Sequence, residues 1–193
     1  MKKILIIFVI LSLIITLPGC KKTGILDPDL ELEQESLETF VIIKNTEYPL
    51  DIARLTISRK EVSDSDVELI GNLRELVFLE LKINDITKIS SLSRLTKLEE
   101  LDLGFNYISD ISPLSGLTNL TRLDLRANKI SNLSGLENLE NLTELNLGSN
   151  DIMDITPLKK LTNLNNLYLN DNSIEESDYI VLRAALPDCN VYF

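Results

Sequence analysis

The sequence predicts an α/β solenoid, in which stacked repeats form a parallel β-sheet on the concave face and short 3₁₀ or helical turns on the convex face. Three observations lead to this prediction. Five asparagines recur at a constant interval of 22 residues, namely Asn84, Asn106, Asn128, Asn150 and Asn172. Apolar residues two positions apart precede each asparagine, and apolar residues at steps of three follow it. A fixed period of this size is typical of a stacked repeat architecture.

Residues 98–119 show how one repeat is built. Leu101 and Leu103 are two residues apart, so they lie on one face of a strand. The next apolar positions are three residues apart, which favours tight turns and 3₁₀ segments over a long helix. They are Ile108, Ile111, Leu114 and Leu117. Pro113 also opposes a long helix in this stretch.

Stacking is required because one repeat has too small a core to offset the conformational entropy of its ordered backbone. Neighbouring repeats close a shared core and pair their strands into one sheet. Each coil turns sharply after its strand, which leaves backbone groups buried in the turn. We expect the asparagine amides to satisfy these groups, since an amide carries both donors and an acceptor.

The pattern L-x-x-L-x-L-x-x-N-x-I-x-x-I/L-x-x-L-x-x-L resembles the leucine-rich repeat, in the 22-residue form of internalin-like bacterial surface proteins. The resemblance covers roughly residues 50–193. It implies the solenoid fold and a binding role for the concave face. It does not name a ligand.

The N-terminal segment predicts export and lipid attachment. Lys2 and Lys3 precede a mainly apolar run of 14 residues, 4–17. As a helix this run would span about 21 Å, which is shorter than the ~30 Å hydrocarbon core of a membrane, so it is typical of a signal peptide. The ending, residues 17–20, resembles a bacterial lipobox, which implies cleavage before Cys20 and a diacylglycerol group on its sulfur. An uncleaved anchor, or an ordinary secretory signal with an incidental cysteine, is the alternative.

These observations divide the chain into four parts: a lipoprotein signal peptide at 1–19, a lipidated tether and N-terminal cap at 20–49, leucine-rich repeats at 50–175 and a C-terminal cap at 176–193. The tether is acidic, and residues 29–43 are expected to form a short amphipathic helix that caps the first repeat. Such a cap is needed because the end of a solenoid otherwise exposes its core.

The first and last repeats depart from the consensus. In residues 52–75, Lys60 occupies the asparagine position, and Ser63 is expected to begin a true helix on the convex side. After Ile174, Ser177 or Asp178 is expected to cap a helix that ends before Pro187. Residues 191–193 then read as a last strand.

Strand residues between the buried leucines are expected to point from the concave face in three columns. The first column is Arg54, Phe78, Glu100, Arg122, Glu144 and Asn166. The second is Thr56, Glu80, Asp102, Asp124, Asn146 and Tyr168. The third is Ser58, Lys82, Gly104, Arg126, Gly148 and Asn170.

Two features of these columns bear on binding. Three adjacent acids in the second column, Glu80, Asp102 and Asp124, either meet a cation or basic partner or are simply solvated beside Arg122 and Arg126; we favour solvation. A group of apolar residues outside the core positions favours a recognition surface in the N-terminal half of the face. Its members are Phe78, Ile83, Phe105 and Tyr107. The full set of expected protein-binding residues is Phe78, Glu80, Lys82, Ile83, Asp102, Phe105, Tyr107, Arg122, Asp124, Arg126 and Tyr168.

Composition excludes several classes of function. The net charge of −11 leaves no basic stripe for nucleic acid. Without histidine there is no Ser-His or Cys-His couple and no histidine-based metal site, and no phosphate-binding glycine loop occurs. Two cysteines cannot make a disulfide framework, and we expect Cys189 to be a packed free thiol.

The sequence thus favours a monomeric, non-enzymatic protein without a cofactor. We expect it on the extracytoplasmic side of the cell membrane, held by a lipid anchor, where it binds an unidentified protein ligand. The alternative is a structural envelope lipoprotein without a defined ligand. An intracellular repeat protein that regulates a phosphatase is a third possibility, which the signal sequence opposes.

Overall fold

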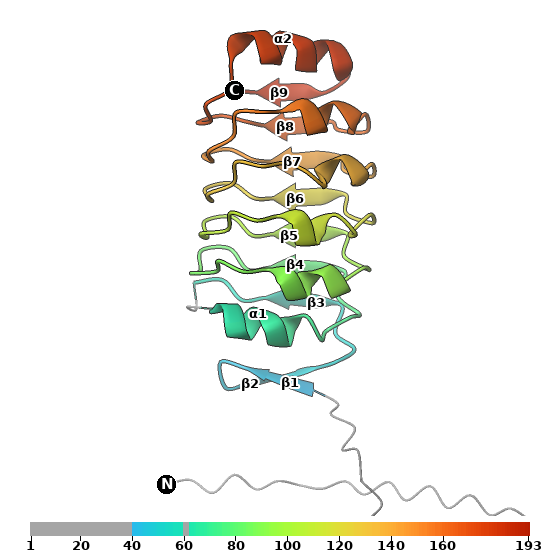
Figure 1. Ribbon diagram of the computed structural model, residues 1–193. Coiled ribbons are helices and arrows are strands. Elements are labelled where there is room, and N and C mark those ends of the chain that lie inside the picture. Colours follow the sequence, from blue (N-terminus) through green and yellow to red (C-terminus); the bar gives the residue numbers. More distant parts are fainter. Residues whose placement is uncertain (1–39, 60–61) are drawn as a thin grey trace, which may run out of the picture. The chain divides into compact units, whose positions relative to one another are not determined.

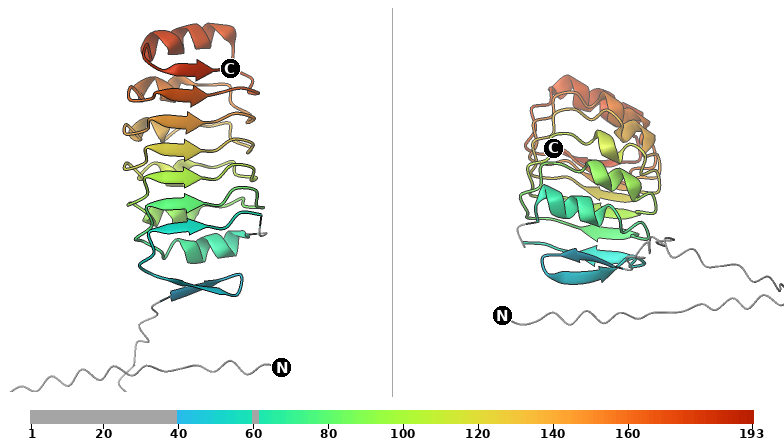
Figure 2. Two further views of the ribbon diagram at one scale, coloured as in Figure 1. Left: turned by 180° about the vertical axis from the view of Figure 1, so that it is seen from behind. Right: turned by 60° about the horizontal axis from the view of Figure 1, so that its bottom comes forward.

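The computed structural model describes residues 40–59 and 62–193, and these residues form the predicted solenoid. Seven parallel strands in the described part of the chain follow one another in sequence order along one sheet (Figure 1). They are β3 (Arg54–Thr56), β4 (Phe78–Glu80), β5 (Glu100–Asp102), β6 (Arg122–Asp124), β7 (Glu144–Asn146), β8 (Asn166–Tyr168) and β9 (Asn190–Tyr192). Figure 2 shows this sheet from behind, with one strand contributed by each repeat.

The convex side carries short helical segments, as the three-residue steps predict. The middle repeats use 3₁₀ turns: η1 (Ser90–Arg94), η2 (Ser112–Leu114), η3 (Leu136–Asn138) and η4 (Thr156–Lys160). Pro113 and Pro157 lie in the first turn of η2 and η4, where a missing N–H has no cost. The first and last repeats use true helices, α1 (Asp64–Ile70) and α2 (Glu176–Ala185). In the described part of the chain, no helix is both long enough and apolar enough to cross a membrane.

Leucine and isoleucine side chains fill the space between the sheet and the convex turns. In the repeat that contains β5, Leu101 and Leu103 enter the core from the sheet. Ile108, Leu114 and Leu117 enter it from the convex side. Every regular repeat contributes side chains at the equivalent positions, so the core is continuous along the stack. Burial of the central residue of each short strand leaves its two neighbours to face the concave side.

The asparagines form the predicted ladder inside the turns. The Nδ2 group of Asn128 donates to the carbonyl oxygens of Leu103 and Leu125, each at 3.0 Å, and its Oδ1 accepts the N–H of Ile108 at 3.0 Å. Each amide therefore joins its own repeat to the preceding one. The same three bonds recur at Asn106, Asn150 and Asn172.

The N-terminal cap differs from the prediction. Residues 40–43 form a strand, not the end of a helix: β1 (Phe40–Ile43) pairs with β2 (Thr46–Pro49) in an antiparallel hairpin. Val41 and Ile43 alternate with exposed neighbours and enter the core, which is a strand pattern. Lys44 and Asn45 both have positive φ, as a two-residue hairpin turn requires. The rest of the expected helix, residues 29–39, and Lys60 lie outside the described residues.

The helix α1 begins after Ser63, as predicted, and the C-terminal cap contains the predicted helix and strand. The helix α2 begins at Glu176, earlier than the Ser177 or Asp178 cap, because Glu175 takes the extended capping conformation. Acidic residues in its first turn suit the positive end of the helix dipole. Leu182 and Leu186 bury against the last repeat, and β9 extends the sheet beside β8.

Candidate functional site

The first two concave columns have the register that the sequence predicts, and the third lies beyond the ends of the short strands. In the first column Phe78 pairs with Glu100, and Arg122 pairs with Glu144 on the next two strands. In the second column Glu80 pairs with Asp102, which in turn pairs with Asp124. Parallel strands place such partners about 5 Å apart, so the columns form a continuous surface across the sheet.

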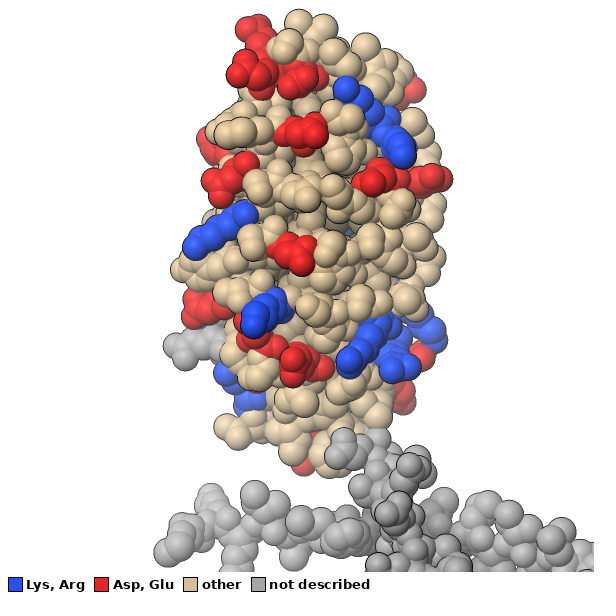
Figure 3. Space-filling view, in the orientation of Figure 1, with Lys and Arg blue, Asp and Glu red and all other residues tan. Residues whose placement is uncertain are grey.

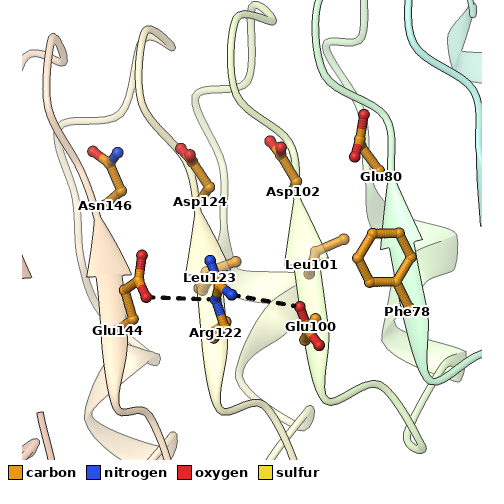
Figure 4. Close-up of a pocket in the computed structure, with 10 residues that line it drawn as sticks. All are labelled: Phe78, Glu80, Glu100, Leu101, Asp102, Arg122, Leu123, Asp124, Glu144 and Asn146. Carbon is orange, nitrogen blue, oxygen red and sulfur yellow. Dashed lines mark ion pairs between the residues drawn. The ribbon is translucent and has the colours of Figure 1, made fainter. Parts of the chain in front are cut away.

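The first column contains a run of alternating charge. The guanidinium group of Arg122 lies 3.9 Å from a carboxylate oxygen of Glu100 and 3.5 Å from one of Glu144 (Figure 4). Cross-strand pairs of opposite charge stabilise a sheet modestly. All three side chains are substantially exposed, so these ion pairs are weak and remain available for exchange with a partner.

The second column is acidic, and most of its charge is compensated locally. Lys82 lies 3.0 Å from Glu80 and 3.8 Å from Asp102, while Arg126 lies 3.4 Å from Asp124. The expectation that Arg126 relieves this column is confirmed. Arg122 instead pairs with the first column, and Lys82 takes its place.

The aspartates of this column also have a structural task. The Oδ1 atom of Asp102 accepts the backbone N–H of Gly104 at 3.0 Å, and Asp124 accepts that of Arg126 at the same distance. Asn146 does the same for Gly148 at 3.1 Å. Short Asp and Asn side chains are favoured for such bonds to the backbone two residues ahead. Solvation and turn formation thus account for this column without a bound cation.

Two carboxyl groups of the column differ in their titration. Burial alone would raise the pKa of Glu80, but the hydrogen bond from Ser58 at 2.8 Å and the charge of Lys82 lower its pKa below the ordinary value. Burial raises the pKa of Asp124, and the carboxylate of Asp102 adds to this effect. The middle of the concave face is therefore where a further negative charge is least favourable.

Three of the four predicted apolar residues lie together. Ile83, Phe105 and Tyr107 line one hollow beyond the ends of β4 and β5, and we call them the apolar group. Their exposed fractions are 37%, 48% and 50%. Phe78 lies apart, on the strand itself, where it lines the hollow of the acidic column and packs against Arg54 at 4.0 Å (Figure 4).

The backbone of the apolar group is unusual. Ile83 and Phe105 have φ values of 57° and 58°, which is the left-handed region. The equivalent residues Ala127, Ser149 and Asp171 share it. From Ile83 to Ser149, the N–H at this position donates to a carbonyl of the next repeat. A β-branched residue such as isoleucine is strongly disfavoured there. Two large apolar side chains are thus held at positions where the repeat alone would favour a small or polar residue.

Cationic side chains cover the aromatic members of the apolar group. The guanidinium group of Arg126 lies 5.2 Å from the ring centre of Phe105, and the ammonium group of Lys129 lies 5.0 Å from that of Tyr107. Cation–π contacts of this kind are attractive by about 0.5–1 kcal/mol at exposed sites. They orient the rings while leaving about half of each exposed.

The repeat pattern also identifies the family of the chain. A model of the leucine-rich repeat, described as two repeat copies, matches four overlapping segments: 72–116, 96–138, 118–159 and 140–179. The chain belongs to the leucine-rich repeat family.

Solved structures place this leucine-rich repeat protein among internalin-like bacterial proteins. An internalin of Listeria monocytogenes, InlF, is 33% identical over 75% of this chain and 42% of its own, with a TM-score of 0.71. A leucine-rich repeat protein of Leptospira interrogans is 32% identical over 65% of this chain and 33% of its own, with a TM-score of 0.62. Internalin C2 of Listeria monocytogenes is 33% identical over 76% of this chain and 74% of its own, with a TM-score of 0.57. No curated protein sequence matches the chain.

This chain spans less than half the length of InlF and of the Leptospira protein. What it shares with them is the repeat domain. The internalin-like fold is consistent with a binding module. Within residues 40–59 and 62–193, no cluster of acidic or cysteine side chains is arranged to hold a metal ion.

Sequence reasoning missed two residues of the concave face, Asn190 and Tyr192. They continue the first and second columns on β9, where Asn190 pairs with Asn166 and Tyr192 with Tyr168. The signal was weak because the last strand follows β8 by 24 residues and Val191 replaces the usual leucine. Tyr168, which the sequence grouped with the protein-binding residues, lies at this end of the face, away from the apolar group.

Cys20 lies outside the described residues, and Cys189 is a partly buried free thiol with its pKa raised by burial.

Proposed function

We propose that this leucine-rich repeat protein is a surface-anchored binding module that recognises a protein ligand through the concave face of its sheet. The observation that carries the proposal is the apolar group, Ile83, Phe105 and Tyr107. These side chains are exposed, lie together, and in two cases are held on a backbone conformation that disfavours them. Backbone strain of this kind is retained most often where a site needs it.

The neighbouring charges suit a protein partner. Arg126 lies over Phe105, and Lys82 precedes Ile83 in the chain; they pair with the partly buried carboxylates of Asp124 and Glu80. Arg122 pairs with Glu144 on the same sheet. An apolar centre with a charged, solvated surround is the usual anatomy of a protein interface. The stacked strands fix these side chains before binding, so little conformational entropy is lost on association.

Figure 3 shows the convex side, opposite the concave columns. On the convex side, acidic and basic side chains are interspersed among uncharged ones, without a broad area of one sign. Met153 is an exposed apolar residue in a turn of a later repeat, away from the hollow that the apolar group lines. It therefore offers a matched control for the apolar group.

The test compares the full chain with two variants in their capture of proteins from a cell surface. A triple variant, Ile83→Ser, Phe105→Ser and Tyr107→Ser, should lose at least about tenfold in affinity for the captured protein, as removal of a central apolar contact does. Met153→Ser should bind as the wild type does. Equal binding by all three proteins would remove the apolar group from recognition and favour the structural envelope role.

Anchoring is the second part of the proposal. Cys20 is the residue we propose to carry the lipid, which places the repeats on the extracytoplasmic side of the cell membrane. Support comes from the lipobox-like residues 17–20 after the short apolar run. Cells that express the full chain would be labelled with a radioactive fatty acid, with Cys20→Ala as the comparison. Label in the wild type alone is expected; equal label, or none in either, contradicts the anchor.

A further inference from the structure

The C-terminal end of the concave face differs in chemistry from the rest. Charged residues dominate the columns from Glu80 to Glu144, whereas Asn146 of β7 and the column members on β8 and β9 are neutral. We call these the amide–tyrosine patch: Asn146, Asn166, Tyr168, Asn190 and Tyr192. Charged residues near the patch have partners: Glu144 pairs with Arg122, and Asp171 accepts hydrogen bonds from Asn170 and Ser149. Arg183, which shares a hollow with Asn190 and Tyr192, lies over the ring of Phe193.

Two tyrosine rings form the centre of this patch. Tyr168 and Tyr192 are register partners on β8 and β9, and their rings stack with centres 4.7 Å apart and planes 9° from parallel. The stack occupies one face of each ring. On its other side Tyr168 has Asn146 of β7 as its register partner, and Tyr192 is 46% exposed on the last strand of the described sheet. The face of an aromatic ring carries partial negative charge and attracts polarised C–H groups.

The amides beside the rings have unused hydrogen-bonding capacity. Asn190 donates its Nδ2 to Oδ1 of Asn166 at 3.3 Å, so the Nδ2 of Asn166 and the Oδ1 of Asn190 have no partner among the described residues. Asn146 uses only its Oδ1, for the N–H of Gly148. The patch therefore offers free donors and a free acceptor within reach of the ring faces. Asn146, Gly148 and Tyr168 border one end of a hollow that gives access to them, and the other end is lined by charged residues of the preceding repeats, among them Arg122, Asp124 and Glu144.

We propose that the amide–tyrosine patch binds a neutral saccharide, at a second site distinct from the apolar group. A pyranose ring presents an apolar C–H face, which can stack on a tyrosine, and a rim of hydroxyls that each donate and accept. Side-chain amides match such hydroxyls because they also carry both functions. A neutral ligand does not require desolvation of an unpaired charge, which suits a surface without one.

The area of the amide–tyrosine patch suits a saccharide and is too small for a protein interface. Three strands about 5 Å apart, with alternate residues about 7 Å apart along each strand, enclose an area of roughly 10 by 7 Å. That area fits one or two sugar rings. A stable protein interface covers about 800 Å² on each partner and would extend into the charged columns.

The test measures binding of four neutral disaccharides: cellobiose, lactose, maltose and N,N′-diacetylchitobiose. Tyrosine fluorescence reports saccharide binding directly, because the chain has no tryptophan. The full chain is used in a detergent without a sugar headgroup, since a glycoside would compete. Saturable binding of at least one disaccharide at millimolar concentration is expected. No binding of any of the four overturns the proposal.

Variants locate the site. Tyr192→Ala should weaken binding at least about tenfold, whereas Tyr192→Phe, which keeps the ring face, should retain most of it. Asn166→Asp adds a charge with little change in shape and should also weaken binding, so the test does not depend on the folding of one variant. Tyr107→Ala is the matched control, an exposed tyrosine of the apolar group, and should leave saccharide binding unchanged.

Two other results overturn the proposal. If Tyr107→Ala weakens disaccharide binding as much as Tyr192→Ala does, the sugar binds elsewhere. If Tyr192→Ala and Asn166→Asp leave disaccharide binding intact but weaken capture of the protein ligand, the amide–tyrosine patch belongs to the protein-binding surface.

Discussion

The asparagine ladder shows how one residue type holds the repeats together. Each amide bonds to two carbonyl groups and one N–H, drawn from its own repeat and the preceding one. The sequence predicts this role because a buried turn leaves backbone groups that only a short amide can satisfy. Asn84, Asn106, Asn128 and Asn150 are all buried, which confirms the prediction.

Replacing one of these amides should therefore destabilise the protein. Asn128→Ala leaves the carbonyls of Leu103 and Leu125 and the N–H of Ile108 without their partner. The expected loss in free energy of unfolding is about 1–3 kcal/mol, measured by denaturant titration. Asn119→Ala is the control, because Asn119 is exposed and makes a single bond between repeats; it should cost less than about 1 kcal/mol. Equal losses would mean that burial of the ladder does not matter.

The positive φ of the residues that precede the ladder asparagines is not predictable from the sequence. Isoleucine and phenylalanine give no sign of positive φ, and only the next repeat's carbonyl imposes it. Ile83→Asn should relieve the strain and raise the free energy of unfolding by about 1 kcal/mol, since asparagine tolerates this region. The same variant should weaken capture of the protein ligand. Tyr107→Asn, at an exposed position outside the left-handed region, should show no gain in stability; a gain there would attribute the effect to polarity instead.

At the scale of the elements, periodic segments were predictable and the ends were not. The strands β4 to β8 and the columns they carry follow from the 22-residue spacing. The sequence places β1 at the end of a predicted helix, residues 29–43, because its apolar residues are few and fit both periods. The two extra column members on β9 were missed because the last strand breaks the spacing. Hydrophobic spacing predicts repeated contacts well and unique contacts poorly.

One ion pair joins the hairpin to the first repeat. Asp66 of α1 accepts the backbone N–H of Ser63 at 2.8 Å and lies 3.1 Å from the ammonium group of Lys44 in the hairpin turn. Burial alone would raise the pKa of Asp66, but the bonds from Ser63 and the charge of Lys44 lower it below 3.8. A lowered pKa means that the carboxylate stabilises the fold above pH 3.8, and that this contribution is lost as the pH falls through the lowered pKa.

Asp66→Asn isolates this charge, since the amide oxygen can still accept the Ser63 N–H. The variant should lose about 0.5–1 kcal/mol of stability at pH 7, in the range of a partly exposed ion pair. The difference from wild type should shrink as the pH falls below 3.8, which thermal unfolding at several pH values would show. Glu68→Gln changes an exposed charge on the same helix and should have little effect. A pH-independent loss for Asp66→Asn would assign the effect to shape and not to charge.

At the scale of the whole molecule, the repeat architecture distributes stability along the stack. Each repeat contacts only its neighbours, and the sheet order follows the sequence order throughout the described strands. Two surfaces of different chemistry can therefore lie on one face without sharing residues: the apolar group in the N-terminal half and the amide–tyrosine patch at the other end. Neither surface should depend on the repeats between them, except through the rigidity of the sheet.

Removal of one full repeat tests this independence. Deletion of residues 118–139 takes out 22 residues and joins Leu117 to Glu140, so the strand and ladder positions stay in register. At about 0.05–0.15 kcal/mol per residue, the shortened protein should lose roughly 1–3 kcal/mol of stability and still unfold cooperatively. Deletion of residues 118–128, half a repeat, removes β6 and Asn128 without their turn and should prevent folding. Circular dichroism and denaturant titration would separate the two outcomes. If both deletions unfold the chain, the repeats are not interchangeable units, and the core must depend on contacts beyond nearest neighbours.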